Sequence, residues 1–144
     1  MVPSPSPAPD SEIKTMKLYS SVERIENELR KRGIELLPNG DGGIGGDSSS
    51  SSSTFVPLDP KSISSVDSMH YEGDDAVYSC IERANVGPAS VLLDVGSGFG
   101  GPARVLAERT GCDVVALEMQ GDVHETAEKL TASCDLGDGT VRHV

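Results

Sequence analysis

The sequence is poor in aromatic residues, and it has no apolar run long enough to span a bilayer. Aromatics make up 3% of the 144 residues, while glycine and proline supply 16 and 9. Such a composition packs little apolar surface, so part of the chain is expected to remain unfolded. The N-terminus, MVPSPSPAPDSE, also has neither the basic nor the apolar region of a secretory signal. We therefore expect a cytoplasmic protein that does not associate with a membrane.

Basic residues are scarce as well. Lysine and arginine total 12 against 23 aspartates and glutamates, which gives a net charge of −11. This charge opposes binding to a phosphate backbone or an anionic membrane, so nucleic acid is not an expected partner. The three cysteines, Cys80, Cys112 and Cys134, form no C-x-x-C pair. An odd set of this kind predicts reduced, inert and partly buried thiols.

The length allows one domain with a tail. Residues 1–12 alternate proline with serine and predict a disordered tail, and residues 13–37 predict an amphipathic helix with Ser20 and Glu23 in capping-box spacing. This helix could bind a partner or act as a lid, but packing against its own domain is the favoured interpretation. Residues 38–58 are rich in glycine and serine and predict a mobile linker.

Helices are predicted first in the remaining segment, residues 59–144. Asp59 and Pro60 are suited to the N-cap and first position of a short helix that extends toward Val66. A second helix is expected to start at Asp74 and to end before Gly87. Its predicted inner face consists of Ala76, Val77, Cys80, Ile81 and Ala84.

The pattern then changes to alternating strands and helices. Strands are predicted at residues 91–95, 114–117 and from 140 onward, with helices at 102–110 and from Asp122 to about Cys134. Val91 to Val95 is a continuous apolar run, which is typical of a strand buried on both faces of a parallel sheet. The predicted fold class is α/β, a Rossmann-like parallel sheet of which only the first βαβαβ half is present.

A glycine-rich turn joins the first of these strands to its helix. Its sequence is DVGSGFGG, from Asp94 to Gly101, and Pro102 begins the helix. Glycine lets the backbone turn sharply and lets a ligand approach closely, while the amides at the start of the helix point into the same crevice. The turn therefore predicts a binding site for a nucleotide-like ligand.

Two classes of ligand fit this turn. Gly96, Gly98 and Gly101 match the dinucleotide pattern G-x-G-x-x-G, and Glu118 follows at about the distance of a ribose-binding carboxylate, which favours NAD. Asp94 opposes that interpretation, because its carboxylate would repel a pyrophosphate. The same charge would attract the sulfonium and ammonium groups of S-adenosylmethionine, which carries no phosphate.

The segment VLLDVGSGFGGPARVLAERTGCDVVALE resembles the first cofactor motif and second strand of class I S-adenosylmethionine-dependent methyltransferases. Its GGPARVLA portion is similar to small-molecule members such as sarcosine and dimethylglycine N-methyltransferases and tocopherol methyltransferases. DSMHYEGDDAV also resembles the segment that lies over the cofactor in these enzymes. The resemblance covers residues 59–144.

The resemblance implies a cofactor site. It would place the cofactor's methionine part over Gly96, Ser97, Gly98 and Gly100, its ammonium group near Asp94, its two ribose hydroxyls on Glu118 and its adenine against Met119. Tyr71, and less surely His70, would close the site from above, although Tyr71 fits equally well as an anchor of the helix junction. Phe99 is expected to be a packing residue.

The resemblance also implies what this chain does not contain. The family fold has a seven-stranded sheet, and most residues that grip the methyl acceptor follow its third strand, so we expect an N-terminal fragment without identified catalytic residues. His124 and Glu125 lie in HETAE, which lacks the second histidine of a zinc site, so we expect no metal; His124 is expected to be exposed and Glu125 to cap Asp122.

The expected function is S-adenosylmethionine-dependent methyl transfer to a small-molecule acceptor. Two alternatives remain: a fragment of an NAD-dependent oxidoreductase, and a non-catalytic adaptor that retains a relic of the fold.

Overall fold

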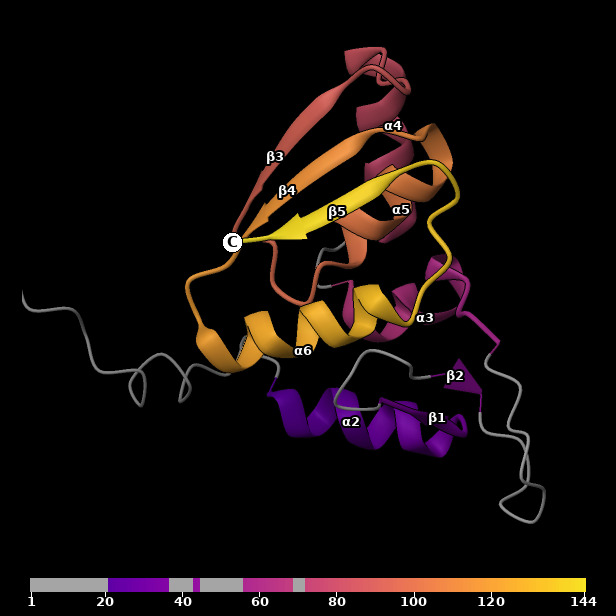
Figure 1. Cartoon of the computed structure of the whole chain (residues 1–144), viewed down its shortest axis with the longest axis vertical. Helices are drawn as coiled ribbons and strands as arrows, with labels where there is room; N and C mark the ends of the chain where they lie inside the picture. Colours follow the sequence, from indigo (N-terminus) through magenta and orange to yellow (C-terminus); the bar gives the residue numbers. More distant parts are fainter. Residues whose placement is uncertain (1–20, 37–42, 45–55, 69–71) are drawn as a thin grey trace, which may run out of the picture.

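A computed structural model describes residues 21–36, 43–44, 56–68 and 72–144 (Figure 1). Among these residues no helix is both long and apolar enough to cross a membrane. The elements, in chain order, are α2 (Val22–Lys31), β1 (Ile34–Glu35), β2 (Gly43–Ile44), α3 (Pro60–Asp67), α4 (Asp74–Ala84), β3 (Val91–Val95), α5 (Gly101–Thr110), β4 (Asp113–Leu117), α6 (Gly121–Ala132) and β5 (Thr140–His143).

The C-terminal half forms a parallel α/β sheet, which confirms the predicted fold class. Its strand order is β3-β4-β5, and both neighbouring pairs are parallel. Val95 lies opposite Leu117, and Ala116 lies opposite His143, so the carboxyl ends of the three strands meet at one edge. In Figure 1 they converge beside the C-terminus. The predicted βαβαβ order is therefore correct.

One face of the sheet is packed against helices and the other is open. Val91, Leu93 and Val95 are 71%, 64% and 70% exposed, whereas Val114 on the opposite face is 1% exposed. We call the side that carries Val91, Leu93 and Val95 the open face. The prediction that this strand is buried on both faces is wrong for the described part of the chain, because no described element covers the open face.

Two apolar clusters hold the helices in place. The first joins α2, α3 and α6 below the sheet, as Figure 1 shows, and it includes Ile25, Leu29, Ile63, Phe99 and Leu130. The second packs α4 and α5 against the covered face of the sheet; it includes Val77, Ala103, Val105, Ala107, Val114 and Ala116. Burying apolar side chains of this kind contributes roughly 1.5 to 3 kcal/mol each, so these clusters supply most of the stabilisation of the fold.

Helix α2 packs on its own domain, as the favoured interpretation predicted. Ile25 and Leu29 are 0% and 1% exposed within the first cluster. The predicted capping box is wrong, because the N-cap is Ser21, whose side chain accepts a hydrogen bond from the Arg24 amide. The part of the predicted helix before residue 21 lies outside the described residues.

The Gly/Ser-rich stretch contains a short strand. Residues Gly43–Ile44 of β2 pair antiparallel with Ile34–Glu35 of β1. The rest of this stretch up to residue 55, and the Pro/Ser tail, lie outside the described residues, so their predicted mobility stays a prediction.

The cysteine predictions hold for two of three residues. Cys112 is buried, and Cys134 is partly buried with a pKa raised to about 11, chiefly because burial disfavours the thiolate. Cys80 is exposed, and the prediction is wrong there. Its helix α4 buries only Val77 fully; Ala76 and Ile81 of the predicted inner face are partly buried, and Cys80 and Ala84 are exposed.

Candidate functional site

The glycine turn between β3 and α5 has a backbone that requires glycine. Gly96, Gly98 and Gly100 have φ values of 75°, 55° and 76°, in the left-handed region that strains other residues. A Cβ at Gly96 or Gly98 would meet nothing within 4 Å, so the space above these two residues is open. The sequence-based prediction of a sharp turn with room for a close ligand agrees with this geometry.

The turn is held against the end of β4 by its own amides. Gly96 and Ser97 both donate to the Leu117 carbonyl, at 2.9 and 3.0 Å. Gly100 donates to the Ser97 carbonyl at 2.9 Å. These amides are therefore already satisfied within the chain, and they do not form an empty cradle for a phosphate group.

Glu118 completes this arrangement from the carboxyl end of β4. One carboxylate oxygen, Oε2, accepts from the Gly98 amide at 2.9 Å, and the other, Oε1, accepts from the Gln120 amide at 2.9 Å. A carboxylate has about four acceptor sites, so two remain after these bonds form. Glu118 therefore keeps acceptor capacity for a ligand, and the ribose role that the resemblance assigns to it stays a prediction.

Asp94 lies one residue before the end of β3. It alternates with the exposed Leu93 and Val95, so it belongs to the covered face, and it is half-buried. Asp94 and Glu118 thus bring two carboxylates to the same edge of the sheet. This edge is suited to a cation and unfavourable for a pyrophosphate.

The other residues predicted for the site differ in their exposure to solvent. Met119 is 82% exposed beyond β4, which leaves it accessible to a flat ligand such as adenine. Ser97 is 7% exposed, and its hydroxyl has no hydrogen-bond partner in the part of the chain that is described. Phe99 is 2% exposed in the first cluster, which confirms it as a packing residue. Tyr71 and His70 lie outside the described residues, so their roles stay predictions.

A buried ion pair beneath the turn was not predicted from the sequence. Arg104 on α5 is 0% exposed, and its guanidinium binds the Asp67 carboxylate at the end of α3. Arg104 also donates to Thr131 on α6 at 3.0 Å. Burial raises the pKa of Asp67, and the adjacent Arg104 opposes that rise. Because Arg104 is sealed in this contact, its charge is not available to a ligand in the crevice.

His143 lies beside this ion pair, and its ring contacts that of a second histidine, His124. The His143 ring nitrogen Nε2 is 2.8 Å from the Thr131 hydroxyl, and its ring lies edge-on to that of His124, with centroids 6.1 Å apart. Burial, aided by the Arg104 charge, lowers the pKa of His143 to about 4, so this imidazole is neutral at physiological pH. No set of three or more metal-ligating side chains is found among the described residues.

The expectations for His124 and Glu125 are wrong. The His124 side chain is 25% exposed and therefore largely covered, because His143 packs against it. Helix α6 starts one residue earlier than predicted, with Gln120 as N-cap and no side-chain cap. Asp122 consequently lies inside the first turn, where its Oδ1 accepts from the Val123 amide, and Glu125 is not its capping partner.

Comparison with known proteins gives two partial matches. The chain is 44% identical over 50 residues to a sarcosine/dimethylglycine N-methyltransferase of Halorhodospira halochloris. It is 54% identical over 35 residues to the sterol 24-C-methyltransferase erg6 of Schizosaccharomyces pombe. The matches cover 31% and 24% of this chain but only 18% and 9% of the two relatives. No family model matches the chain. Both relatives are named methyltransferases, so the similarity points to methyl transfer as the class of reaction.

Proposed function

We propose that this chain binds S-adenosylmethionine at the turn between β3 and α5 and serves as the cofactor-binding part of an enzyme that methylates a small molecule. The proposal is carried by one observation: the Glu118 carboxylate accepts a hydrogen bond from the Gly98 amide. In a dinucleotide-binding protein, the pyrophosphate would lie at this part of the turn. The hydrogen bond to Glu118 occupies a turn amide that a pyrophosphate would use and places a carboxylate beside it, which is unfavourable for a dinucleotide; S-adenosylmethionine carries no phosphate and is not opposed in this way.

Each described residue of the site has a role in this proposal. Glu118 accepts hydrogen bonds from both ribose hydroxyls while it keeps its hydrogen bonds from the Gly98 and Gln120 amides. Asp94 attracts the ammonium group. The open space above Gly96 and Gly98 accommodates the methionine part. Met119 lies against the adenine. The partial matches to two methyltransferases support the same cofactor.

Methyl transfer demands little acid-base chemistry from the protein. The bound cofactor supplies a methyl group already activated by its sulfonium, and the protein aligns an acceptor with that methyl and excludes water. The residues described here hold the donor. We assign no catalytic residue, because none of them is placed to grip an acceptor.

Isothermal titration of the 144-residue chain with S-adenosylmethionine, S-adenosylhomocysteine and NAD tests the proposal. We expect both adenosyl ligands to bind and NAD not to bind. Glu118→Ala should weaken S-adenosylmethionine binding by about 1.5 to 3 kcal/mol, or about ten- to 150-fold, since it removes hydrogen bonds to a charged group. Asp94→Asn should also weaken it, because the cationic ligand loses a counter-charge.

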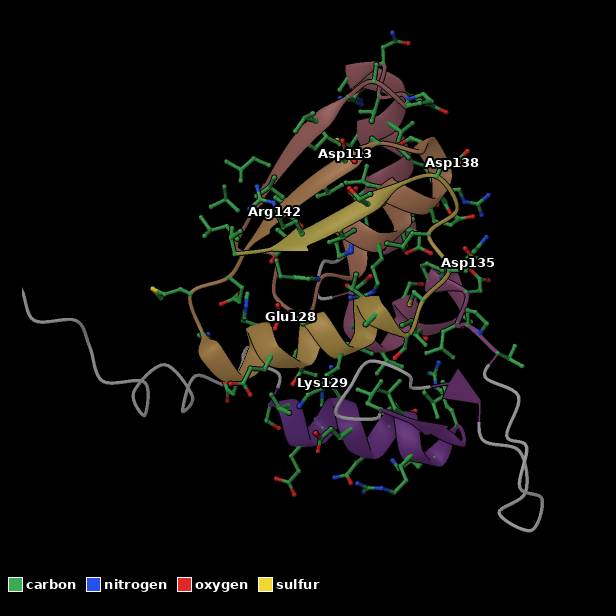
Figure 2. The ribbon with its side chains drawn as sticks, viewed as in Figure 1. Asp113, Glu128, Lys129, Asp135, Asp138 and Arg142 are labelled. Carbon is green, nitrogen blue, oxygen red and sulfur yellow. The ribbon has the colours of Figure 1, made fainter. Side chains whose placement is uncertain are left out.

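Two controls separate lost binding from lost folding. Asp113→Asn removes a carboxylate at the other end of β4, as Figure 2 shows, and should leave the affinity unchanged. Glu118→Gln keeps one carbonyl acceptor and should fall between the parent and Glu118→Ala. Tighter NAD binding by Asp94→Asn, with no S-adenosylmethionine binding by the parent, would instead identify an oxidoreductase fragment. Binding of none of the three ligands would favour a non-catalytic adaptor.

A further inference from the structure

The side chains of the open face form three rows across the sheet. Every second residue of β3, β4 and β5 points to this face, because side chains alternate along a strand. The strand register places them side by side: the first row is Val91, Asp113 and Thr140, the second is Leu93, Val115 and Arg142, and the third is Val95, Leu117 and Val144. Every side chain of the third row is apolar, and charged side chains occur only in the other two rows.

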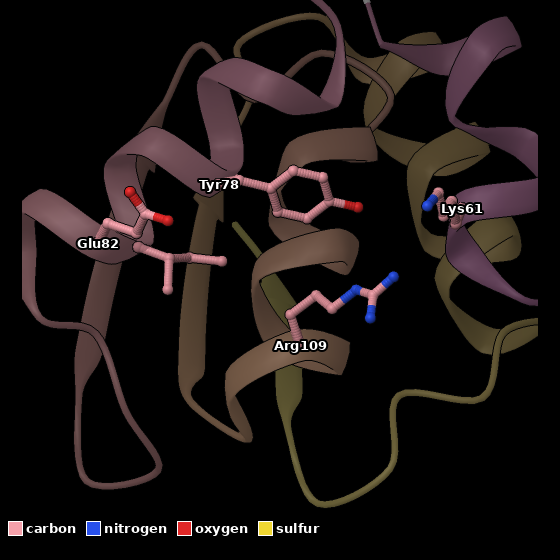
Figure 3. A pocket seen from close by; sticks show the side chains of 5 residues that line it. Lys61, Tyr78, Glu82 and Arg109 are labelled. Carbon is pink, nitrogen blue, oxygen red and sulfur yellow. The ribbon is translucent and has the colours of Figure 1, made fainter.

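Helices already cover the opposite side of the sheet. Leu92 and Val141 pack there in the second cluster with Val77 of α4. The helices also contact each other: the guanidinium carbon of Arg109 on α5 lies 5.7 Å from the centre of the Tyr78 ring on α4, and Figure 3 shows both side chains. A second copy of the chain can therefore reach the side chains of the strands only at the open face.

Two charged side chains of opposite sign lie on the open face. Asp113 accepts a hydrogen bond from the Thr140 hydroxyl through Oδ1 at 2.5 Å, and Arg142 is exposed on β5. In the described part of the chain neither residue forms an ion pair. The net side-chain charge of this face is therefore zero, although the whole chain carries −11. Two copies meet less repulsion at this face than their total charge would produce.

The pattern of the open face is complementary to itself under a two-fold rotation. Neighbouring strands are about 4.8 Å apart, and residues on one face of a strand are about 6.6 Å apart, so the nine side chains form a nearly square grid. We consider a two-fold axis that lies parallel to the sheet along the diagonal from Val95 to Thr140. Rotation about it makes the strands of the two copies cross at nearly right angles, which is one of the two usual packings of sheets.

This rotation places apolar side chains against apolar ones and joins opposite charges. The apolar contacts between the two copies are Leu93 with Leu117, Val91 with Val144, and Val95 and Val115 each with its own equivalent. Arg142 of each copy faces Asp113 of the other, so the ion pair occurs twice. The other diagonal would instead place Arg142 against Leu117 and Asp113 against Leu93, which buries both charges without a partner.

We propose that the open face binds the open face of a second copy of this chain, in a symmetric dimer in which Arg142 of each copy pairs with Asp113 of the other. Contact removes the exposed apolar side chains of both copies from water. Three strands of five residues span about 15 by 17 Å, so each copy buries less than the roughly 800 Å² of a standard interface. The dimer is therefore weak, with a dissociation constant on the order of 100 µM.

Sedimentation of the 144-residue chain between about 10 µM and 1 mM tests this proposal. We expect the parent to convert reversibly from monomer to dimer over this range. Arg142→Asp places two acids opposite each other at both ion pairs, and Asp113→Arg places two arginines there, so each variant should dimerise at least about fivefold more weakly. An equimolar mixture of the two variants should recover the affinity of the parent, because every charged contact in the mixed dimer then joins opposite charges.

Arg83→Asp is the matched control, because it makes the same change of charge on an exposed residue of α4, behind the sheet. It should dimerise as the parent does. The double variant Leu93→Thr and Val95→Thr should dimerise more weakly, since it makes the face more polar. A parent that stays monomeric at about 1 mM, or a mixture that associates no better than its separate variants, would overturn the proposal. Equal weakening by Arg83→Asp would also overturn it, because the effect of Arg142→Asp would then reflect total charge.

Discussion

Gly100 combines two constraints on a single residue of the candidate site. Its φ is 76°, and a Cβ there would lie 2.8 Å from the His143 ring and 3.1 Å from the Arg104 guanidinium. Both neighbours are held in place, His143 by Thr131 and Arg104 by Asp67. Gly100→Ala should therefore lower the free energy of unfolding by at least about 1 to 2 kcal/mol, measured by urea denaturation.

Gly87→Ala is the control for this substitution. Gly87 lacks a positive φ, and a Cβ there would meet nothing within 4 Å. Its replacement should leave stability unchanged or raise it by about 0.4 to 1 kcal/mol, because alanine restricts the unfolded chain. Equal effects of the two substitutions would show that the turn tolerates a side chain at Gly100.

The residues of the turn could be predicted from the sequence, whereas the ion pair beneath it could not. Glycines at Gly96, Gly98 and Gly100 indicate their own backbone conformation, since few other residues adopt it. Arg104 gives no such local signal. An arginine is buried only where a partner reaches it, and Asp67 is separated from it by 37 positions in the chain.

At the scale of elements, the Arg104 guanidinium ties three helices together. It joins α5 to Asp67 on α3 and to Thr131 and the Ala127 carbonyl on α6. Asp67→Asn preserves the shape of the side chain but leaves the arginine charge buried without a counter-charge. We expect it to lower the free energy of unfolding by about 3 to 5 kcal/mol, measured by urea denaturation at neutral pH.

An exposed ion pair of α2 provides the control. Nζ of Lys31 lies 3.3 Å from Oε2 of Glu28, and the two side chains are 74% and 36% exposed. Glu28→Gln should change stability by less than about 1 kcal/mol, because water screens this pair. A similarly small effect of Asp67→Asn would mean that the Arg104 charge finds another partner or reaches solvent.

Helix positions were predictable from the sequence, but their first residues only in part. Asp59 followed by Pro60 identifies the residue at which α3 begins, because proline fits the first turn of a helix but not its interior. Elsewhere several capping residues compete. Ser20 and Ser21 are adjacent and chemically equal, so the local sequence does not specify which of them is the N-cap; in the structure it is Ser21.

At the scale of the whole molecule, the alternation of strands and helices was predictable, but the environment of the sheet was not. An apolar run such as Val91 to Val95 indicates that both faces of a strand require cover. It does not indicate which element covers them. In the described chain α4 and α5 cover one face, and Val91, Leu93 and Val95 remain exposed on the other.

The open face should be detectable in solution. Exposed apolar side chains that adjoin one another on a sheet bind hydrophobic dyes and favour association. We expect the monomeric chain, isolated by gel filtration, to enhance the fluorescence of such a dye. The double variant Leu93→Thr and Val95→Thr should reduce that fluorescence while it preserves strand propensity, because threonine is β-branched and polar.

Val114→Thr makes the same kind of change on the covered face, where the residue is 1% exposed. It buries a hydroxyl among apolar side chains and should lower the free energy of unfolding by about 1 to 3 kcal/mol, as judged by urea denaturation. Helices cover the face that carries Val114 but not the open face. The open-face double variant should therefore bind less dye while its free energy of unfolding stays nearly unchanged. If the parent monomer did not enhance the fluorescence of the dye, the open face would be contradicted, because the three adjoining apolar side chains would then be shielded from solvent.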